Sequence, residues 1–320
     1  MATRIGVLTS GGDAPGMNTA IRAVVRAGIH FGMEVYGIRG GYEGLLNGDI
    51  KQMQSSDVGG IIHRGGTMLY TARCERFKTP EGQDKGFMMA QNFGLNALVV
   101  IGGDGSMRGG IQLAKRGLPV MFIPGSIDND LGYTDLTIGY DTSVNTVLDA
   151  IGKIRDTSES HNRTLIVEVM GRHCGDIAMA AGLAGGAESI LVPEQDYDLN
   201  LICRRIVEGK NAGKRHYIIV KAEGVKENPY EMAKLLEERT GSETRVVVLG
   251  YIQRGGAPDS TDRILASRMG YKAIELIAAG SESRAIGFVG NQIVSYPLEE
   301  ALNVEKSFDD EFLKIAEALA

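Results

Sequence analysis

The sequence has few cysteines, and they are not spaced for metal binding. Only three occur among 320 residues, Cys74, Cys174 and Cys203, and no two form a C-x-x-C pair. This predicts reduced thiols in a cytoplasmic protein and argues against a disulfide framework or a zinc site. The first residues show no basic stretch followed by a long apolar run, so we expect no signal peptide. No run of about 18 apolar residues is present, which argues against a membrane span.

The chain also lacks an excess of positive charge. It has 34 Lys and Arg residues against 40 Asp and Glu residues, a formal net charge of −6. We therefore expect no basic field that would attract nucleic acid or an anionic membrane surface. An anionic ligand would have to be held by a local arginine cluster. The length of 320 residues suits about two domains.

Glycine, by contrast, is abundant, and its placement matters more than its number. The 44 glycines gather behind short apolar runs. Five such runs predict strands buried on both faces, at 5–9, 98–101, 120–123, 165–170 and 246–249. Amphipathic helical patterns at 19–29 and 142–155 lie between them. This alternation predicts an α/β protein of two doubly wound, mostly parallel-sheet domains, in which ligands bind beyond the carboxyl ends of the strands.

No proline- or serine-rich linker marks the domain boundary. A change of sheet is expected near 138–140, with the chain crossing back near 255. This predicts one domain of residues 1–138 plus about 256–305, and a second of residues 139–255 plus about 306–320.

Two glycine clusters, 11–13 and 102–106, follow predicted strands and each contains an aspartate. Glycine allows positive φ and lets backbone N–H groups approach a polyanion closely. Neither cluster is a Walker motif or a G-x-G-x-x-G motif. A tight strand-to-helix turn would explain either cluster alone, whereas two of them on neighbouring strand ends favour a nucleotide phosphate site.

The segment Asp128-Asn129-Asp130 places two carboxylates on one side of an extended chain. Mg²⁺ is the natural partner of such a pair, since it binds one or two carboxylates together with waters and substrate phosphates. An Asx-rich turn is the alternative. Phosphoryl transfer needs a metal, anion-binding donors and a carboxylate that takes a hydroxyl proton, and Asp104, Asp128 and Asp130 could supply the acids.

Arginines bracket two of the predicted strands. Arg163 and Arg172 flank one, and Arg245 and Arg254 flank the other. Nine residues of strand span about 30 Å, so Arg163 and Arg172 of one chain cannot hold one small ligand. If both serve the same kind of site, a neighbouring subunit supplies one of them. Surface arginines without a ligand are the alternative, as they are for the helical pair Arg22 and Arg26.

Together these segments resemble the bacterial ATP-dependent 6-phosphofructokinases. LTSGGDAPGMN, ARCERF, GGDGS, GSIDNDL, KIRDTSESHNR, VMGRHCGD, AEG and GYIQRGG follow that family's order and spacing between Ile5 and about Val294. The resemblance implies an allosteric, Mg²⁺-dependent glycolytic kinase that phosphorylates fructose 6-phosphate with ATP, usually as a homotetramer. Another kinase with a GGDG segment would leave GSIDND and the arginines unexplained. A non-catalytic sensor would be expected to have lost Asp104 or Asp128, and a nicotinamide-dependent dehydrogenase would need G-x-G-x-x-G.

The resemblance assigns roles residue by residue. It implies an ATP site made of Gly12, Tyr42, Arg73, Cys74, Gly103, Asp104, Gly105 and Ser106. It implies a catalytic set of Asp128 as the base, with Ser126, Arg172, Arg73 and Gly12. Asp104 and Asp130 would serve the metal.

It also implies two further sites. The sugar-phosphate site would comprise Ser126, Ile127, Asp128, Arg163, Met170, Gly171, Arg172, Glu223, Arg245, Tyr251, Ile252, Gln253 and Arg254. Arg163 and Arg245 would come from the adjacent subunit. The effector site, for ADP or phosphoenolpyruvate, would comprise Arg22, Arg26, Arg155, Gly186, Glu188, Lys214, Arg215 and His216.

Several positions bear on specificity and regulation. Gly105 and Gly125 stand where pyrophosphate-using relatives carry aspartate and lysine, which favours ATP over pyrophosphate as the donor. Ser126 replaces a usual threonine and keeps its hydroxyl. Tyr251 replaces a usual histidine, so we expect weaker binding of the sugar phosphate. Ser55 and Ala212 replace effector-site arginines, so we expect a weakened allosteric response.

Overall fold

The computed structural model describes residues 3–319. Its contacts group these residues into two units. Unit 1 contains residues 3–127, Leu131–Thr142 and Arg254–Lys306, and unit 2 contains Asp128–Asp130, Ser143–Gln253 and 307–319. That these units bind ATP and sugar phosphate respectively stays a prediction.

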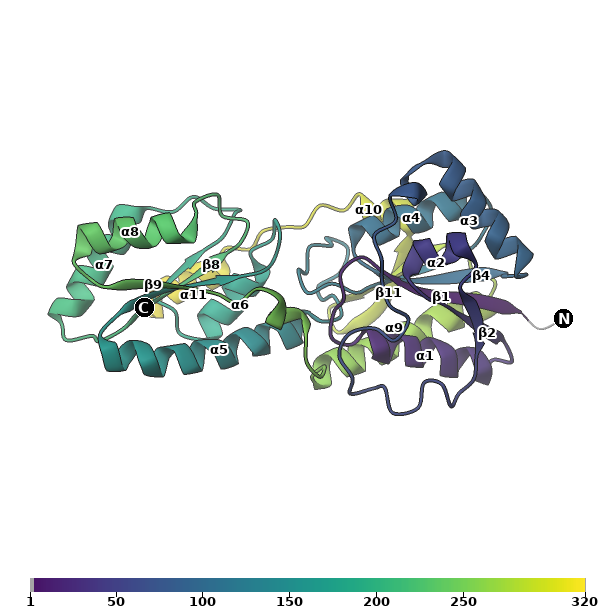
Figure 1. Ribbon diagram of the computed structural model, residues 1–320, viewed down its shortest axis with the longest axis horizontal. Coiled ribbons are helices and arrows are strands. Elements are labelled where there is room, and N and C mark those ends of the chain that lie inside the picture. Colours follow the sequence, from purple (N-terminus) through teal and green to yellow (C-terminus); the bar gives the residue numbers. More distant parts are fainter. Residues whose placement is uncertain (1–2, 320) are drawn as a thin grey trace. The chain divides into compact units, whose positions relative to one another are not determined.

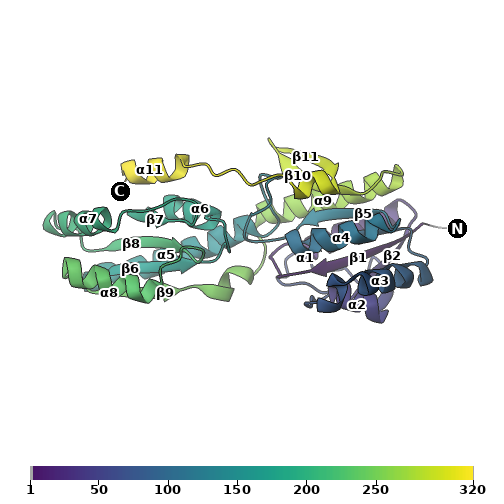
Figure 2. The same cartoon turned by 90° about the horizontal axis from the view of Figure 1, so that it is seen from above.

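Unit 1 is built on a seven-stranded sheet of order β11-β10-β5-β4-β1-β2-β3. Its strands are β1 (Arg4–Ser10), β2 (Glu34–Ile38), β3 (Ile50–Met53), β4 (Ala97–Gly102), β5 (Val120–Pro124), β10 (Arg284–Val289) and β11 (Gln292–Pro297). Pairing is parallel except at the two edges, where β3 and β11 run antiparallel to their neighbours. β10 and β11 lie side by side at one edge (Figure 2).

Helices cover both faces of this sheet (Figure 1). On one face α1 (Met17–His30) packs against α9 (Ser260–Ala278). The other face carries α2 (Gly41–Asn47), α3 (Pro80–Asn92), α4 (Asp104–Lys115) and α10 (Leu298–Leu302), with the short 3₁₀ helix η1 (Glu75–Lys78) beside them. Because β1, β4 and β5 are covered on both sides, nearly all of their residues are buried.

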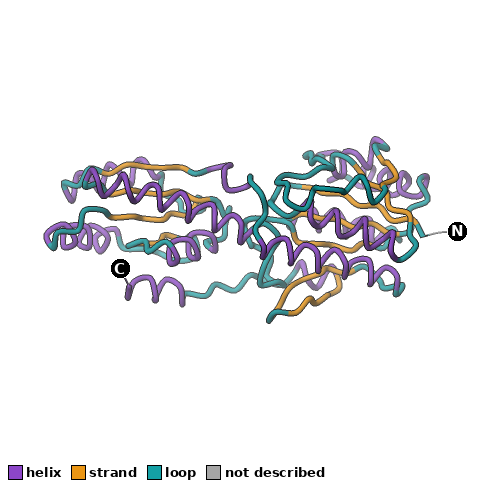
Figure 3. The backbone as a smooth tube through the Cα atoms, turned by 90° about the horizontal axis from the view of Figure 1, so that it is seen from below, coloured by secondary structure: helices purple, strands orange, loops and turns teal. Residues whose placement is uncertain are grey.

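Unit 2 contains a four-stranded parallel sheet of order β7-β8-β6-β9. Its strands are β6 (Thr164–Val169), β7 (Ser189–Leu191), β8 (Tyr217–Ala222) and β9 (Thr244–Val248). Its helices are α6 (Asp176–Ala184), α7 (Leu199–Asn211), α8 (Pro229–Thr240) and α11 (Glu311–Leu319), together with most of α5 (Tyr140–His161). In both units the strands are flanked by helices (Figure 3).

The predicted α/β class with mostly parallel sheets is confirmed. All five predicted strands and both predicted helices are present, as β1, β4, β5, β6, β9, α1 and α5, although β6 and β9 each end one residue before the predicted end at 170 and 249. The prediction that 246–249 is buried on both faces is wrong, because β9 is an edge strand that pairs only with β6 and leaves Val248 48% exposed. Among residues 3–319, no helix combines the length and apolar character needed to span a membrane.

Candidate functional site

The two predicted phosphate-binding clusters lie together in unit 1. β1 and β4 are paired in parallel, with Ser10 opposite Gly102, so both glycine clusters follow the carboxyl ends of adjacent strands. The packing there is tight, because a Cβ on Gly102 would lie 2.4 Å from the Ser10 carbonyl oxygen. Gly11 has φ of +86°, in the region that favours glycine. Glycine is therefore required for these two turns to approach each other.

The amino end of α4 is open and begins with an acid. The helix starts at Asp104, whose side chain is 36% exposed and whose carboxylate lies 4.0 Å from Arg108. A Cβ built on Gly103 or Gly105 would meet no atom within 4 Å. Backbone N–H groups and the helix dipole at such an end attract anions. This geometry suits a polyphosphate that approaches the backbone closely.

Tyr42 contacts the first turn of α4. Its side chain is 5% exposed, and its hydroxyl donates to the Ser106 carbonyl oxygen at 2.6 Å. The ring stacks on Phe77 with centroids 4.2 Å apart, and burial raises the pKa of the phenol. These contacts favour a positioning role for Tyr42, which fastens α2 to the start of α4.

Cys74 is part of a small polar network. Its thiol donates to Glu43 at 3.0 Å, and Arg76 also pairs with that carboxylate. The Cys74 hydrogen bond, followed by that of Arg76, lowers the pKa of Glu43, while burial raises the pKa of the Cys74 thiol. Arg73, just before this network, is exposed. Glu43 was not predicted as part of a site, because a single helical glutamate carries no signal of its own in the sequence.

Gly12 and Arg254 lie together in unit 1, although they are 242 residues apart. A Cβ on Gly12 would lie 3.2 Å from Nη1 of Arg254. The family resemblance implies that Gly12 belongs to the ATP site and Arg254 to the sugar-phosphate site. The structure therefore places a guanidinium beside the first glycine turn.

Ser126 is held by the segment that follows the candidate catalytic loop. Its N–H donates to the Ile138 carbonyl oxygen at 3.1 Å, and its own carbonyl accepts from the Thr137 hydroxyl at 2.6 Å. Ile127 is buried. These backbone contacts hold residues 125 and 126 next to residues 137 and 138.

The segment 128–130 groups with unit 2, and side-chain contacts of Asn129 and Asp130 help to fix it. The Asn129 amide donates to Asp176 at 2.8 Å, and Asn129 has φ of +53°. Asp130 lies 3.7 Å from Nη1 of Arg172. Asp176, at the start of α6, was missed by the sequence analysis. The two contacts hold Asn129 and Asp130, the two residues that follow Asp128.

The turn after β6 carries Met170, Gly171 and Arg172. Gly171 has φ of +139°, and a Cβ there would lie 2.3 Å from the Cys174 carbonyl oxygen. Arg172 has φ of +58°, and its N–H donates to Glu223 at 2.9 Å. This turn is therefore tight and strained, and Glu223 holds it by a charge-assisted hydrogen bond.

The short helix η2 (Gly250–Arg254) carries predicted sugar-phosphate residues in contrasting environments. Tyr251 is 79% exposed and Ile252 is 58% exposed. Gln253 is fully buried, with its amide oxygen accepting from Met170 N–H at 3.1 Å and its amide nitrogen donating to the Gly250 carbonyl. Gln253 thus ties η2 to the end of β6, which favours a positioning role.

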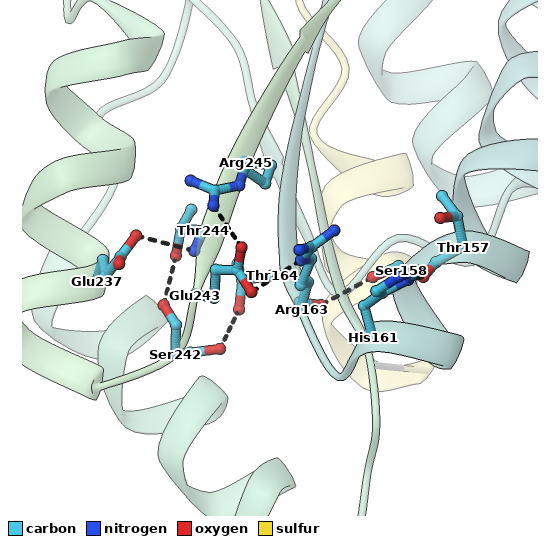
Figure 4. Close-up of polar contacts among 10 residues, drawn as sticks. All are labelled: Thr157, Ser158, His161, Arg163, Thr164, Glu237, Ser242, Glu243, Thr244 and Arg245. Carbon is cyan, nitrogen blue, oxygen red and sulfur yellow. Dashed lines mark hydrogen bonds and ion pairs between the residues drawn. The ribbon is translucent and has the colours of Figure 1, made fainter.

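Arg163, just before β6, and Arg245, on β9, lie at the end of the unit 2 sheet away from the turn that follows β6. Both pair with the carboxylate of Glu243 (Figure 4). Glu243 lies 2.9 Å from Nε of Arg163 and also pairs with Arg245. The hydrogen bond from Arg163 is the main cause that lowers the pKa of Glu243. Arg163 precedes β6 and Arg172 follows it, as the sequence indicates. In unit 2, Arg163 and Arg245 thus lie at one end of β6 and Arg172 lies at the other end.

The predicted effector residues fall on both units. In unit 2, Glu188 is 5% exposed and lies 2.8 Å from Lys214 and 3.7 Å from His216. Arg155 donates to the carbonyl oxygen of Gly186 at 3.1 Å, and Arg215 is exposed. Arg22 and Arg26 lie on α1 of unit 1. Lys214 and Glu188 therefore form an ion pair near the start of β8, and His216 lies beside it.

No cluster of three or more His, Cys, Asp or Glu side chains that could hold a metal occurs among residues 3–319. The partly exposed Asp104 carboxylate still fits a hard cation that keeps most of its waters. Asp104 belongs to unit 1 and Asp130 to unit 2.

Comparison with known proteins gives consistent results. Residues 4–277 match the phosphofructokinase family. The chain is 56% identical over 316 residues to the ATP-dependent 6-phosphofructokinase of Alkaliphilus metalliredigens, covering 99% of both chains. It is similar in structure to Saccharomyces cerevisiae phosphofructokinase, with a TM-score of 0.89 and 34% identity over 99% of this chain and 50% of that one. A Pichia pastoris phosphofructokinase in the T-state gives a TM-score of 0.89 and 37% identity, over 100% of this chain and 39% of that chain. The chain thus spans half or less of these two yeast chains.

Proposed function

Because this chain belongs to the phosphofructokinase family, we propose that it is an ATP-dependent 6-phosphofructokinase. It transfers the γ-phosphoryl group of ATP to the 1-hydroxyl of fructose 6-phosphate, giving fructose 1,6-bisphosphate and ADP in glycolysis. The observation that carries this proposal is the 56% identity, over nearly the full length of both chains, to bacterial enzymes of that name. Its free cysteines suit a cytoplasmic location.

The nucleotide site, in this proposal, is the junction of the two glycine turns in unit 1. The open amino end of α4 offers N–H groups to the phosphates, and Tyr42 holds that end through Ser106. Arg73 and Cys74 lie on the segment that precedes η1. Glycine at 105 leaves the space above the helix open for the nucleotide, which supports ATP as the donor.

Asp128 is proposed as the base that takes the proton from the sugar 1-hydroxyl. Asn129 and Asp130 on its carboxyl side are fixed to Asp176 and Arg172, which restricts the loop that carries the base. The Ser126 backbone is held on the other side by Thr137 and Ile138. A base positioned in this way contributes about 10²–10⁴-fold to the rate.

The family implies a divalent metal, and we propose Mg²⁺ held through Asp104, with Asp130 supporting the metal or orienting the base. When bound, the ion neutralises charge on the β- and γ-phosphates. The partly exposed carboxylate of Asp104 leaves room for the waters that Mg²⁺ retains. Arg172 and Arg73 are proposed to neutralise charge on the transferring phosphoryl group, with the backbone of Gly12 beside it.

The sugar phosphate is proposed to bind at the turn after β6, against Met170, Gly171, Glu223 and Arg254. Arg163 and Arg245 would hold its 6-phosphate from an adjacent subunit of a homotetramer. The pairing of both guanidiniums with Glu243 shows that they converge on one anionic group. A phosphate would replace this partly exposed carboxylate and accept bidentate charge-assisted hydrogen bonds from the guanidiniums.

Effector binding is proposed at the cluster of Glu188, Lys214 and His216, with ADP or phosphoenolpyruvate as the effector. Arg22 and Arg26 of a second subunit would complete it. Ser55 and Ala212 reduce the positive charge available there.

The test offers the purified protein ATP or pyrophosphate together with fructose 6-phosphate or other hexose phosphates. Formation of the 1,6-bisphosphate is followed through aldolase. We expect product with ATP and fructose 6-phosphate only. Turnover with pyrophosphate alone would establish the alternative donor, and the absence of any bisphosphate would reject the proposal.

A further inference from the structure

A lysine is buried in the sheet of unit 2. Lys221, on β8, is 1% exposed. It is thus a charged residue buried beside the fully buried apolar residues Ile219 and Val220. Its ammonium lies 2.9 Å from Oε2 of Glu168, the residue opposite it on β6. Burying an ammonium group costs free energy unless it is paired and hydrogen-bonded. An apolar side chain of similar size would fill the same space in the core. The ammonium group at this position therefore calls for a reason other than packing.

The remaining hydrogen bonds of Lys221 go to one turn. Nζ donates to the carbonyl oxygens of Val225, at 3.1 Å, and Ala222, at 3.4 Å. These residues close the turn 222–225, in which Val225 N–H donates to the Ala222 carbonyl at 3.1 Å. The ammonium thus ties the turn after β8 to Glu168 on β6.

This turn carries Glu223, which holds the candidate substrate-binding turn after β6. Glu223 N–H donates to the Val169 carbonyl at 2.8 Å, and its carboxylate accepts from Arg172 N–H at 2.9 Å. Arg172 has φ of +58°, a conformation that persists only when its surroundings enforce it. Its guanidinium extends toward Asp130. The contacts therefore run from Lys221 through the turn to the backbone of Arg172.

We propose that Lys221 is a positioning residue for the sugar-phosphate site, which fixes the 222–225 turn so that Glu223 holds the strained backbone of Arg172. This inference rests on the proposed function for the identity of the ligand. The ammonium itself is buried and acts through Glu223 and Arg172. Its contribution is to the geometry of the site and therefore to binding of fructose 6-phosphate.

The test compares three variants with the wild-type protein. Lys221→Met keeps the length of the side chain and removes the ammonium. Lys221→Met combined with Glu168→Met removes both charges of the pair and leaves neither unpaired. Lys234→Met makes the same chemical change on α8, where the side chain is 79% exposed, and serves as the control. Thermal stability, the KM for each substrate and amide hydrogen exchange at Arg172 are measured for each.

We expect Lys221→Met to raise the KM for fructose 6-phosphate about 10- to 100-fold, with the KM for ATP changed less than about twofold, because small displacements in a positioned site have effects of this size. The double variant should regain thermal stability and keep the raised KM. Lys234→Met should resemble the wild type in all measurements.

Two results would overturn the proposal. The first is an unchanged KM for fructose 6-phosphate in Lys221→Met. The second is a double variant whose stability and KM for fructose 6-phosphate both return to the wild-type values, since Lys221 would then only neutralise Glu168. If Lys221→Met does not fold, the double variant decides.

A wild-type protein that does not phosphorylate fructose 6-phosphate would reject the proposed function instead. Hydrogen exchange then decides the positioning role without activity. Faster exchange of the Arg172 amide in the double variant supports it, and unchanged exchange overturns it.

Discussion

Replacing Gly105 with aspartate tests whether the open space at the start of α4 belongs to the nucleotide. A Cβ at this position meets no atom within 4 Å, so the new side chain needs no rearrangement of the protein. Gly125 is a poorer choice, because a Cβ there would lie 3.1 Å from both Ile101 and Met17. A change at Gly105 therefore separates ligand binding from packing.

The expected effects on stability and on ATP binding have opposite signs. Glycine within a helix costs about 0.5–1 kcal/mol relative to alanine, and an acid in the first turn adds about 0.3–1 kcal/mol of stability. The free energy of unfolding should therefore stay the same or rise slightly. A carboxylate about 5 Å from a phosphate charge costs about 1–3 kcal/mol at an effective dielectric constant of about 20–80. The KM for ATP should accordingly rise roughly 5- to 150-fold.

Gly105→Ala is the matched control, since it adds the Cβ without the charge. The aldolase-coupled assay gives the KM for ATP, and urea unfolding gives the stability of each variant. We expect Gly105→Ala to be stabilised and to retain most of its affinity for ATP. Equal ATP affinity in the aspartate and alanine variants would refute the reasoning, because the carboxylate would then lie away from the phosphates.

Four further predictions concern catalysis, affinity, regulation and pH. Asp128→Ser should lower kcat by at least about 10²-fold and leave nucleotide affinity, measured by calorimetry, largely intact; an active variant would remove Asp128 as the base. Tyr251→His should lower the KM for fructose 6-phosphate. An unchanged or raised KM would contradict the expectation that tyrosine at this exposed position weakens binding of the sugar phosphate. Because Ser55 and Ala212 replace arginines, phosphoenolpyruvate should inhibit weakly, and strong inhibition at micromolar concentrations would contradict this. Burial raises the pKa of Asp262, which accepts from Gly139 and Thr142, to about 6. The folded protein then holds this proton more tightly than the unfolded chain. The stability from this group, about 3 kcal/mol, is present below about pH 4 and lost as the pH rises through about 6. Thermal unfolding should show the wild type losing stability relative to Asp262→Asn over that range, and parallel pH profiles would exclude the effect.

The strands that could be predicted from sequence are those with unbroken apolar runs. Residues 5–9, 98–101 and 120–123 are buried on both faces, so every position must be apolar or small. The same pattern misled at 246–249, because an edge strand can carry valines on its exposed side. β8 was not among the predicted strands, although residues 217–220 form an apolar run that Lys221 follows. The pairing with Glu168 across the sheet, together with the carbonyl oxygens of Val225 and Ala222, makes that lysine compatible with burial.

The candidate site divides in the same way. Glycine turns and acids at strand ends could be predicted, because their backbone conformations and charges are local properties of the chain. The pairing of Arg163 and Arg245 with Glu243, the contact of Asn129 with Asp176 and the support of Tyr42 for Ser106 could not.

The sequence by itself determined the parallel α/β class, the glycine turns and the kinds of groups available for phosphoryl transfer. The tertiary structure decided which charges are paired, which are buried and which side chains support others. The physical reason is that the contacts that shape the site join residues far apart in the sequence, as when strand register brings Glu168 to Lys221 and the fold brings Gly12 to Arg254. The role of a charged side chain depends on its partner and on its burial. Neither can be predicted from the residues next to it in the sequence.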